Sequence, residues 1–271
     1  MISYGVMRNA SKTRYSRPFN AEDDMNNLEY FKDAFNSVGW FIPPYVGLGF
    51  LADLSKKIKD ANGSYSQQDL ERMLSLIYSP ESLAAMVLNR YPITPFIKDY
   101  SQIISESVIA HFSNLDHVAV AGLMPVIEGA GTALAKDRSV PCNRVSTRVI
   151  FMGLADSCKE LSRKHNIGNV GEIVSMMDSF KEYADKYLYI KSSQYSQSDK
   201  TNRHGILHGA YTDGDYGTPI NFYKAIAAVD FLCFISAFRS AISWFAPDPT
   251  DKSKLLAKHY GACLLLSVIK P

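Results

Sequence analysis

The sequence has few cysteines, and they lie far apart. Its four cysteines, Cys142, Cys158, Cys233 and Cys263, form no CxxC pair. This excludes a zinc ribbon, which needs paired cysteines, and a small fold held by disulfides, which needs many of them. We expect reduced thiols in a cytoplasmic protein, because disulfides persist mainly in oxidising compartments.

Long hydrophobic runs are also scarce. The most apolar long stretch, Ala225–Phe238, contains an aspartate, Asp230. It is shorter than the roughly 20 apolar residues that a helix needs to cross a bilayer. The N-terminus lacks the apolar centre of a secretion signal. We therefore expect a buried core helix at this stretch, no contact with a membrane and a cytoplasmic location.

Glycine and proline, with 16 and 12 of 271 residues, are too few for a collagen-like or low-complexity chain. Hydrophobic residues make up 46% and charged residues 21%, which excludes a wholly disordered chain. The net charge of +2 is no general signature of nucleic-acid binding. Lysine and arginine do exceed acids within residues 1–20 and 136–165. Each segment is either a solvated basic face or a surface that contacts phosphate.

Alternating β-branched runs bounded by turns are scarce, whereas apolar residues recur at helical spacing. We predict an all-α protein with a helical N-terminal region, residues 1–95, and a helical bundle, residues 96–271. In the first part we expect four short helices, the first capped by Asn20 and the last starting at Ser79-Pro80. In the second part we predict helices over 96–111, 116–135, 145–165, 170–189, 202–209, 219–245 and 251–269.

One short segment concentrates residues that can carry chemistry. It reads Thr201-Asn-Arg-His-Gly-Ile-Leu-His-Gly209, in a chain that has only six histidines. His204 and His208 are four residues apart, so they share a face if the segment is helical. The long side chain of Arg203 can reach the same place. We expect Ser198, Asp199 or Thr201 to cap this helix.

These residue types suit cleavage of an RNA phosphodiester without a metal. A helix N-terminus attracts phosphate, and arginine offers a planar, always-charged fork for its oxygens. Histidine moves protons near neutral pH. A base would take the proton of the 2′-hydroxyl, the arginine would stabilise the charged phosphorane, and an acid would protonate the leaving oxygen.

Two glycines give a further hint in this segment. Gly205 and Gly209 are four residues apart, and each would cost about 1 kcal/mol relative to alanine inside a helix. The spacing predicts a smooth strip against which another helix packs closely. That helix would belong to this chain or to a second subunit.

The run Arg203-His204-Gly205-Ile206-Leu207-His208 resembles the motif of the HEPN superfamily (higher eukaryotes and prokaryotes nucleotide-binding). That motif is an arginine, a polar residue, three further residues and a histidine. The residues around it, and the apolar helix that follows, are similar to the motif region of many prokaryotic HEPN proteins; they are Asn202, Tyr211, Gly217-Thr218 and Asn221. The resemblance covers about residues 100–271, and the first 95 residues resemble no family.

The resemblance implies a bundle of four or five helices that forms a homodimer, with the arginine and histidine of both protomers facing a shared cleft. It implies a metal-independent endoribonuclease without cofactors, acting as a toxin or antiphage effector. Arg203 would bind and polarise the phosphate, His208 would be the general acid or base, and His204 would orient or assist. Partners would be RNA, such as tRNA or mRNA, a second copy of the chain, and an antitoxin or defence-system protein.

Some members of the superfamily lack activity, so the alternative function is a nucleotide- or nucleic-acid-binding module in a larger complex. A purely structural helical scaffold is a third interpretation. Arg203 and His208 would then be a structural pair. His204 and His208 also have the spacing of a metal-binding pair, but no third ligand is evident.

Glu128 and Asn202 are the predicted supporting residues. Glu128 lies in an otherwise apolar predicted helix, and a buried carboxylate needs a partner. Unless it is exposed, we expect that partner to be Arg203 or His208.

Tyrosines and lysines alternate just before the motif. They form either a basic and aromatic surface for single-stranded RNA or an ordinary helix face. The residues are Tyr183, Tyr187, Tyr189, Lys181, Lys186 and Lys191.

Overall fold

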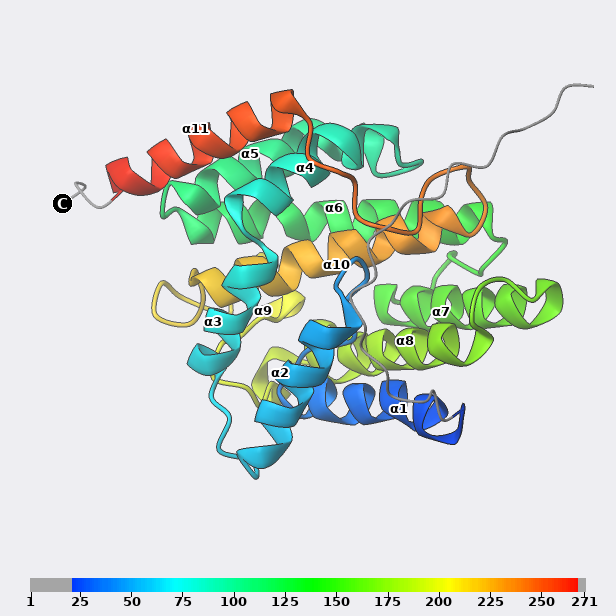
Figure 1. Ribbon diagram of the computed structural model, residues 1–271. Helices are drawn as coiled ribbons and strands as arrows, with labels where there is room; N and C mark the ends of the chain where they lie inside the picture. The colour runs from blue at the N-terminus through cyan, green and yellow to red at the C-terminus, as the bar shows by residue number, and fades with distance from the viewer. Residues whose placement is uncertain (1–20, 268–271) are drawn as a thin grey trace, which may run out of the picture.

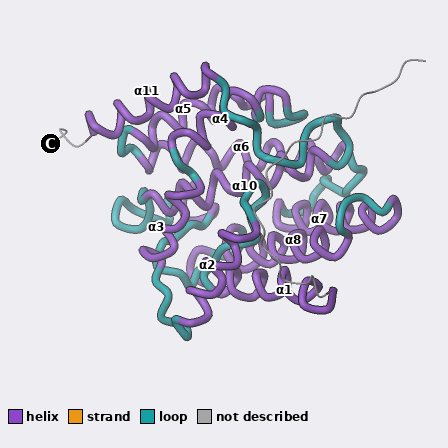
Figure 2. The backbone as a smooth tube through the Cα atoms, viewed as in Figure 1, coloured by secondary structure: helices purple, strands orange, loops and turns teal. Residues whose placement is uncertain are grey.

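The computed structural model describes residues 21–267, with side chains from residue 28 onward. Within that range every regular element is a helix and no strand is present (Figure 2). The predicted all-α fold is therefore confirmed. The predicted cap Asn20 lies outside the described residues.

The first part contains four helices, as expected. They are α1 (Ala21–Ser37), α2 (Leu48–Asp60), α3 (Gln67–Ile77) and α4 (Pro80–Asn89), followed by the 3-10 turns η1 (Tyr91–Ile93) and η2 (Lys98–Tyr100). Ser66 and Ser79 cap α3 and α4 by accepting backbone N–H groups. The start at Ser79 was predicted from the sequence, because a cap is local to its helix.

The second part contains longer helices. They are α5 (Ser101–Phe112), α6 (Asp116–Asp137), α7 (Thr147–His165), α8 (Val170–Tyr183), α9 (Arg203–Leu207), α10 (Pro219–Ala237) and α11 (Asp251–Ser267), with a π-helical turn η3 (Ala184–Leu188) and a 3-10 turn η4 (Ser192–Gln194).

Several of the predicted ranges were too long, including 202–209, of which only Arg203–Leu207 is helical. The helix predicted from residue 96 begins at Ser101, because Phe96 has a φ of +68° and the turn η2 intervenes. The helix predicted to residue 189 changes to the π-helical turn after Tyr183. The apolar helix predicted to residue 245 ends at Ala237.

Helix α10 runs through the centre of the molecule (Figure 1). Every residue from Ile220 to Ala237 is buried. Helices α4, α5, α6 and α11 lie on one side of α10 and α1, α2, α7 and α8 on the other (Figure 1). One continuous hydrophobic core includes Phe35 and Leu83 from the first part and Phe231 from α10. The helices before residue 95 therefore share a core with those after it.

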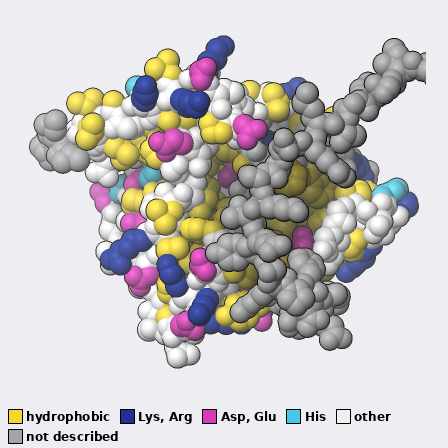
Figure 3. All heavy atoms as spheres, viewed as in Figure 1, with side chains coloured by type: hydrophobic (Ala, Val, Ile, Leu, Met, Phe, Trp, Pro, Cys, Tyr) yellow, Lys and Arg dark blue, Asp and Glu magenta, His cyan; other side chains and the backbone are white. Residues whose placement is uncertain are grey.

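Two of the described helices, α6 and α10, are long and apolar enough to cross a membrane by composition alone. A core helix of a soluble protein passes the same test, and all of the apolar window of α10 is buried inside the fold. Leu255, Leu265 and Leu266 of α11 are exposed. Hydrophobic side chains are visible on the face of the molecule that Figure 3 shows. Apolar side chains gathered in this way are typical of surfaces that contact other molecules.

Candidate active site

Asn202 fixes the start of α9. Its side-chain oxygen accepts the N–H of Gly205 at 2.9 Å, and its amide nitrogen donates to the carbonyls of Tyr187 at 2.8 Å and Ile190 at 2.9 Å. The side chain is fully buried. Asn202 therefore caps α9 and ties it to the end of the π-helical turn.

The predicted caps were wrong. Asp199 and Thr201 are buried and bond to each other, and neither caps α9. Because the side chain of Asn202 accepts the N–H of Gly205 and α9 has only five residues, its N-terminus is not the phosphate site that the sequence suggested. Any anion site must use other groups.

The two histidines do lie on one side of α9. The rings of His204 and His208 are stacked, with centroids 5.7 Å apart. His208 is the C-cap, with a φ of −100° and a ψ of 9°, and it is exposed. The short helix therefore presents His208 at its open end.

Arg203 forms a two-point ion pair with Glu128, which projects from α6. Nε of Arg203 lies 2.6 Å from Oε1 of Glu128, and Nη2 donates to Oε2 at 2.8 Å. The two side chains are 19% and 21% exposed. Arg203 is thus one of the two partners that we predicted for Glu128. The contact through Nη2 is a hydrogen bond, whereas the one through Nε is an ion-pair contact without one, and together they position the guanidinium.

The third side of the guanidinium faces the histidines. Nη1 of Arg203 lies 2.7 Å from Nε2 of His208 and 3.4 Å from Nδ1 of His204. A guanidinium only donates, so Nε2 of His208 accepts in this contact. His208 thus presents an acceptor nitrogen to a fixed cation.

The pKa of His204 is lowered by its surroundings. Partial burial lowers the pKa of His204, and the positive charge of Arg203 and the neighbouring His208 lower it further, against an opposing effect of Glu128. At neutral pH, His204 is therefore neutral and can orient a substrate by hydrogen bonding.

The predicted glycine strip is absent. A side chain at Gly205 would meet the ring of Tyr211 at 2.1 Å, so this glycine accommodates a tyrosine of the same chain. Gly209 lies beyond α9 with a φ of +67° and open space around it. The two glycines therefore have separate structural reasons: Gly205 leaves room for the ring of Tyr211, and Gly209 adopts a left-handed backbone conformation.

Of the two interpretations of the tyrosines and lysines before the motif, the structure excludes the aromatic surface for RNA. Tyr183, Tyr187 and Tyr189 are 0%, 8% and 5% exposed, so none offers its ring to a nucleic-acid base. The tyrosines belong to the core. Lys186 and Lys191 remain exposed beside them.

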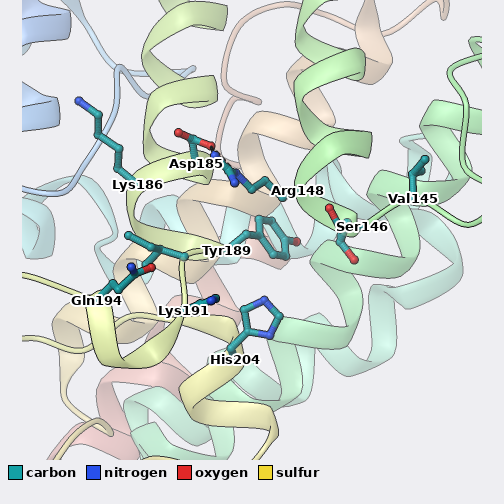
Figure 4. A pocket seen from close by; sticks show the side chains of 11 residues that line it. Val145, Ser146, Arg148, Asp185, Lys186, Tyr189, Lys191, Gln194 and His204 are labelled. Atoms are coloured by element: carbon teal, nitrogen blue, oxygen red, sulfur yellow. Dashed lines mark hydrogen bonds and ion pairs between the residues drawn. The ribbon is translucent and has the colours of Figure 1, made fainter.

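A cavity of about 630 Å³ adjoins the cluster at His204 (Figure 4). The start of α7, the π-helical turn and the segment around η4 form its other walls. Sequence reasoning missed this cavity, because its residues come from four separated segments. The excess of basic residues within 136–165 was the one signal, and Arg148 of that segment lines the cavity.

Within the described part of the chain, no three His, Cys, Asp or Glu side chains are placed to hold a metal ion. No protein-family model, curated protein or solved structure matches this chain.

Proposed function

We propose that this protein is a metal-independent endoribonuclease of the HEPN type. The observation that carries the proposal is the contact between Arg203 and His208, 2.7 Å apart, with the guanidinium fixed by Glu128. The motif supplies the residue types, and the geometry brings them within reach of one phosphate. If Arg203 and His208 were only a structural pair, nothing would require the side chain of His208 to be exposed.

Each residue has a role in this proposal. Nη1 of Arg203 turns from His208 to a non-bridging oxygen of the scissile phosphate and stabilises the charge of the phosphorane. Nε2 of His208, released from Arg203, accepts the proton of the 2′-hydroxyl. The 2′-oxygen attacks phosphorus, the bond to the 5′-oxygen breaks, and a 2′,3′-cyclic phosphate forms.

The leaving 5′-oxygen needs a proton from a second group. In a homodimer with a shared cleft, the partner subunit's His208 in its protonated form would donate it. This division of roles is the reason for including the homodimer in the proposal. The expected solution mass is then twice 30.2 kDa, about 60 kDa, which light scattering measures.

The biological setting follows from the motif resemblance. We propose a cytoplasmic toxin or antiphage effector that acts on RNA such as tRNA or mRNA. A protein of this kind needs an antitoxin or a defence-system partner that restrains it until required. Neither a membrane nor a cofactor enters the proposed reaction.

The decisive experiment compares the wild type with His208→Ala and Arg203→Ala. Each protein is incubated with total RNA and purified tRNAs in EDTA, and the new ends are mapped. We expect cleavage by the wild type, 2′,3′-cyclic phosphate ends, and rates lower by about 10²–10⁴ for His208→Ala, the contribution of one general acid–base group. His165→Ala, at the exposed end of α7, is the matched control. Equal rates for wild type and His208→Ala would sink the assignment.

A non-catalytic nucleotide-binding module is the second candidate. It is favoured by the ion pair with Glu128, which occupies two faces of the Arg203 guanidinium, and by the small net charge of +2. No cleavage by any of the three proteins, with nucleotide binding that survives in both variants, would favour this candidate over the enzyme.

A further inference from the structure

The cavity beside His204 has its own set of polar groups. Val145 to Arg148 form one wall, where α7 begins. Asp185, Lys186 and Tyr189, from the π-helical turn and the residue after it, form another, and Lys191 and Gln194 close the cavity near His204 (Figure 4). None of these residues except His204 belongs to the proposed catalytic cluster.

Tyr189 carries an unsatisfied hydroxyl into this cavity. The residue is 5% exposed, and its hydroxyl has no hydrogen-bond partner within the described residues. The ring extends from the π-helical turn toward α7, and the hydroxyl points toward Ser146 (Figure 4). A buried hydroxyl without a hydrogen-bond partner is unfavourable, so a ligand that accepts its hydrogen bond is stabilised there.

The hydroxyl remains a donor under ordinary conditions. Burial raises the pKa of Tyr189 well above its usual value, and the nearby negative charge of Glu128 raises it further, against an opposing effect of Arg203. The ligand group that fits a permanent donor is an acceptor. The same effects place Tyr189 within electrostatic reach of the Arg203–Glu128 pair.

The charge of the cavity is positive. Three cations line it, Arg148, Lys186 and Lys191, against one carboxylate, Asp185. Arg148 pairs with Asp185, and Lys186 pairs with Glu182 at 2.6 Å. Lys191 is exposed and makes no ion pair within the described residues. It is the cation most available to a ligand.

The start of α7 adds backbone donors. This helix has 19 residues, its first turn contains no acid, and the side chain of its N-cap, Ser146, accepts no backbone N–H. The N–H groups of a first turn have no partner within the helix, and the helix dipole favours an anion there. In α9, by contrast, Asn202 accepts the N–H of Gly205.

We propose that this cavity binds a phosphate group through the start of α7, the hydroxyl of Tyr189, and the cations Lys191 and Arg148. Its place beside His204 makes it the subsite for a phosphate next to the scissile one. That assignment to an RNA strand rests on the proposed nuclease function. The binding of phosphate itself rests only on the cavity. A free nucleotide offers the same chemistry, so the test must separate the two sources.

The test measures binding by calorimetry and fluorescence anisotropy. The probes are inorganic phosphate, adenosine monophosphate, and a short single-stranded RNA with 2′-O-methyl groups, which lacks the attacking hydroxyl. The variants are Lys191→Gln, Tyr189→Phe and Asp185→Asn. Lys164→Gln is the matched control, since Lys164 is an exposed lysine at the opposite end of α7.

We expect Lys191→Gln to weaken the binding of every probe that binds by about tenfold. In a plot of the logarithm of the RNA binding constant against the logarithm of salt concentration, the slope should become shallower by roughly 0.7, which corresponds to one phosphate contact. Tyr189→Phe should weaken binding by roughly 3–10-fold, the range of one hydrogen bond to a charged group. It should leave the melting temperature unchanged or raised, because the hydroxyl has no partner to lose.

Asp185→Asn should tighten binding, because it releases Arg148. Lys164→Gln should bind as the wild type does.

The experiments distinguish failure of the phosphate subsite from failure of the proposed nuclease function. If no probe binds, or if Lys164→Gln weakens binding as much as Lys191→Gln, the phosphate subsite is overturned, whatever the protein does to RNA. Specific binding without RNA cleavage by the wild type supports the subsite and overturns the nuclease. Binding of RNA but not of the mononucleotide identifies the strand as the source, and the reverse identifies a free nucleotide.

Discussion

The guanidinium of Arg203 is shared between a carboxylate and an imidazole. Glu128 holds two of its edges, which leaves Nη1 as the edge that faces His208. Glu128 is therefore a positioning residue in the proposed reaction, and it need not touch RNA. Its effect should be on the rate of the chemical step more than on substrate binding.

Replacing Glu128 by glutamine tests this role. The amide cannot form the two-point ion pair, so the guanidinium loses its fixed position while gaining freedom to bind phosphate. We expect kcat to fall by about 10²-fold, the effect of a misplaced catalytic group, with KM unchanged or lower. Single-turnover cleavage measures the split. Glu106→Gln, an exposed glutamate on α5, is the control. A rise in KM at constant kcat would show that Glu128 serves binding instead.

At the scale of elements, α9 is too short to be stable by itself and is held by its neighbours. Asn202 makes four hydrogen bonds to backbone groups, one within α9 and three to carbonyls of the segment that ends the π-helical turn, the one to Leu188 being long at 3.5 Å. Carbonyls at the end of a helix have no partner within it, so they need such a donor. Asn202 thus couples the motif to the wall of the phosphate cavity.

Asn202→Ala should accordingly be a destabilising change. The lost cap costs about 1 kcal/mol, and the buried carbonyls left unsatisfied cost a further 1–3 kcal/mol. At 2–4 °C per kcal/mol for a domain of this order of size, we expect a melting temperature lower by roughly 5–15 °C. Calorimetry measures it, with the exposed Asn143→Ala as the control. A melting temperature lowered by less than about 1 °C would mean that the hydrogen bonds of Asn202 contribute little to stability.

The elements and the motif were predictable to the extent that they are local. Ser79 and Pro80 mark a helix start by themselves, and Arg203 and His208 lie within six residues of one another. The cap of α9 was not predictable, because the carbonyls that select Asn202 become available only where α8 changes to a π-helical turn. The cavity was hidden for a similar reason. Its donors, on α7 and near η4, meet only in the fold.

At the scale of the whole molecule, the central helix α10 carries two charged residues into the core. Lys224 is fully buried and lies 3.0 Å from Asp199, and it donates to Gln67 at 2.7 Å. It thereby links α10 to α3 and to the segment before α9. An ion pair of this kind is strongly destabilising to break, because the remaining partner becomes an uncompensated buried charge.

Asp230, two turns further along α10, has no such cation at ion-pair distance within the described residues. It accepts the hydroxyl of Tyr91 at 2.8 Å. Burial raises the pKa of Asp230 to about 7, although the hydrogen bond from Tyr91 and the charge of Arg90 lower it. In the unfolded chain an aspartate has a pKa of about 3.9. The folded protein therefore binds the proton more tightly than the unfolded chain does.

The sign of the pH dependence follows from this difference. The contribution of Asp230 to stability is fully present below about pH 4 and is lost as the pH rises through about 7, since the unfolded chain ionises first. Asp230→Asn stays uncharged and can still accept the hydroxyl of Tyr91. We expect the variant to melt several degrees above the wild type at pH 8, at about 1.4 kcal/mol for each unit of pKa difference, and the two to converge near pH 4. Calorimetric melting at both pH values tests this expectation. If the melting temperatures of wild type and Asp230→Asn differed by the same amount at pH 4 and at pH 8, Asp230 would carry the same charge at both pH values.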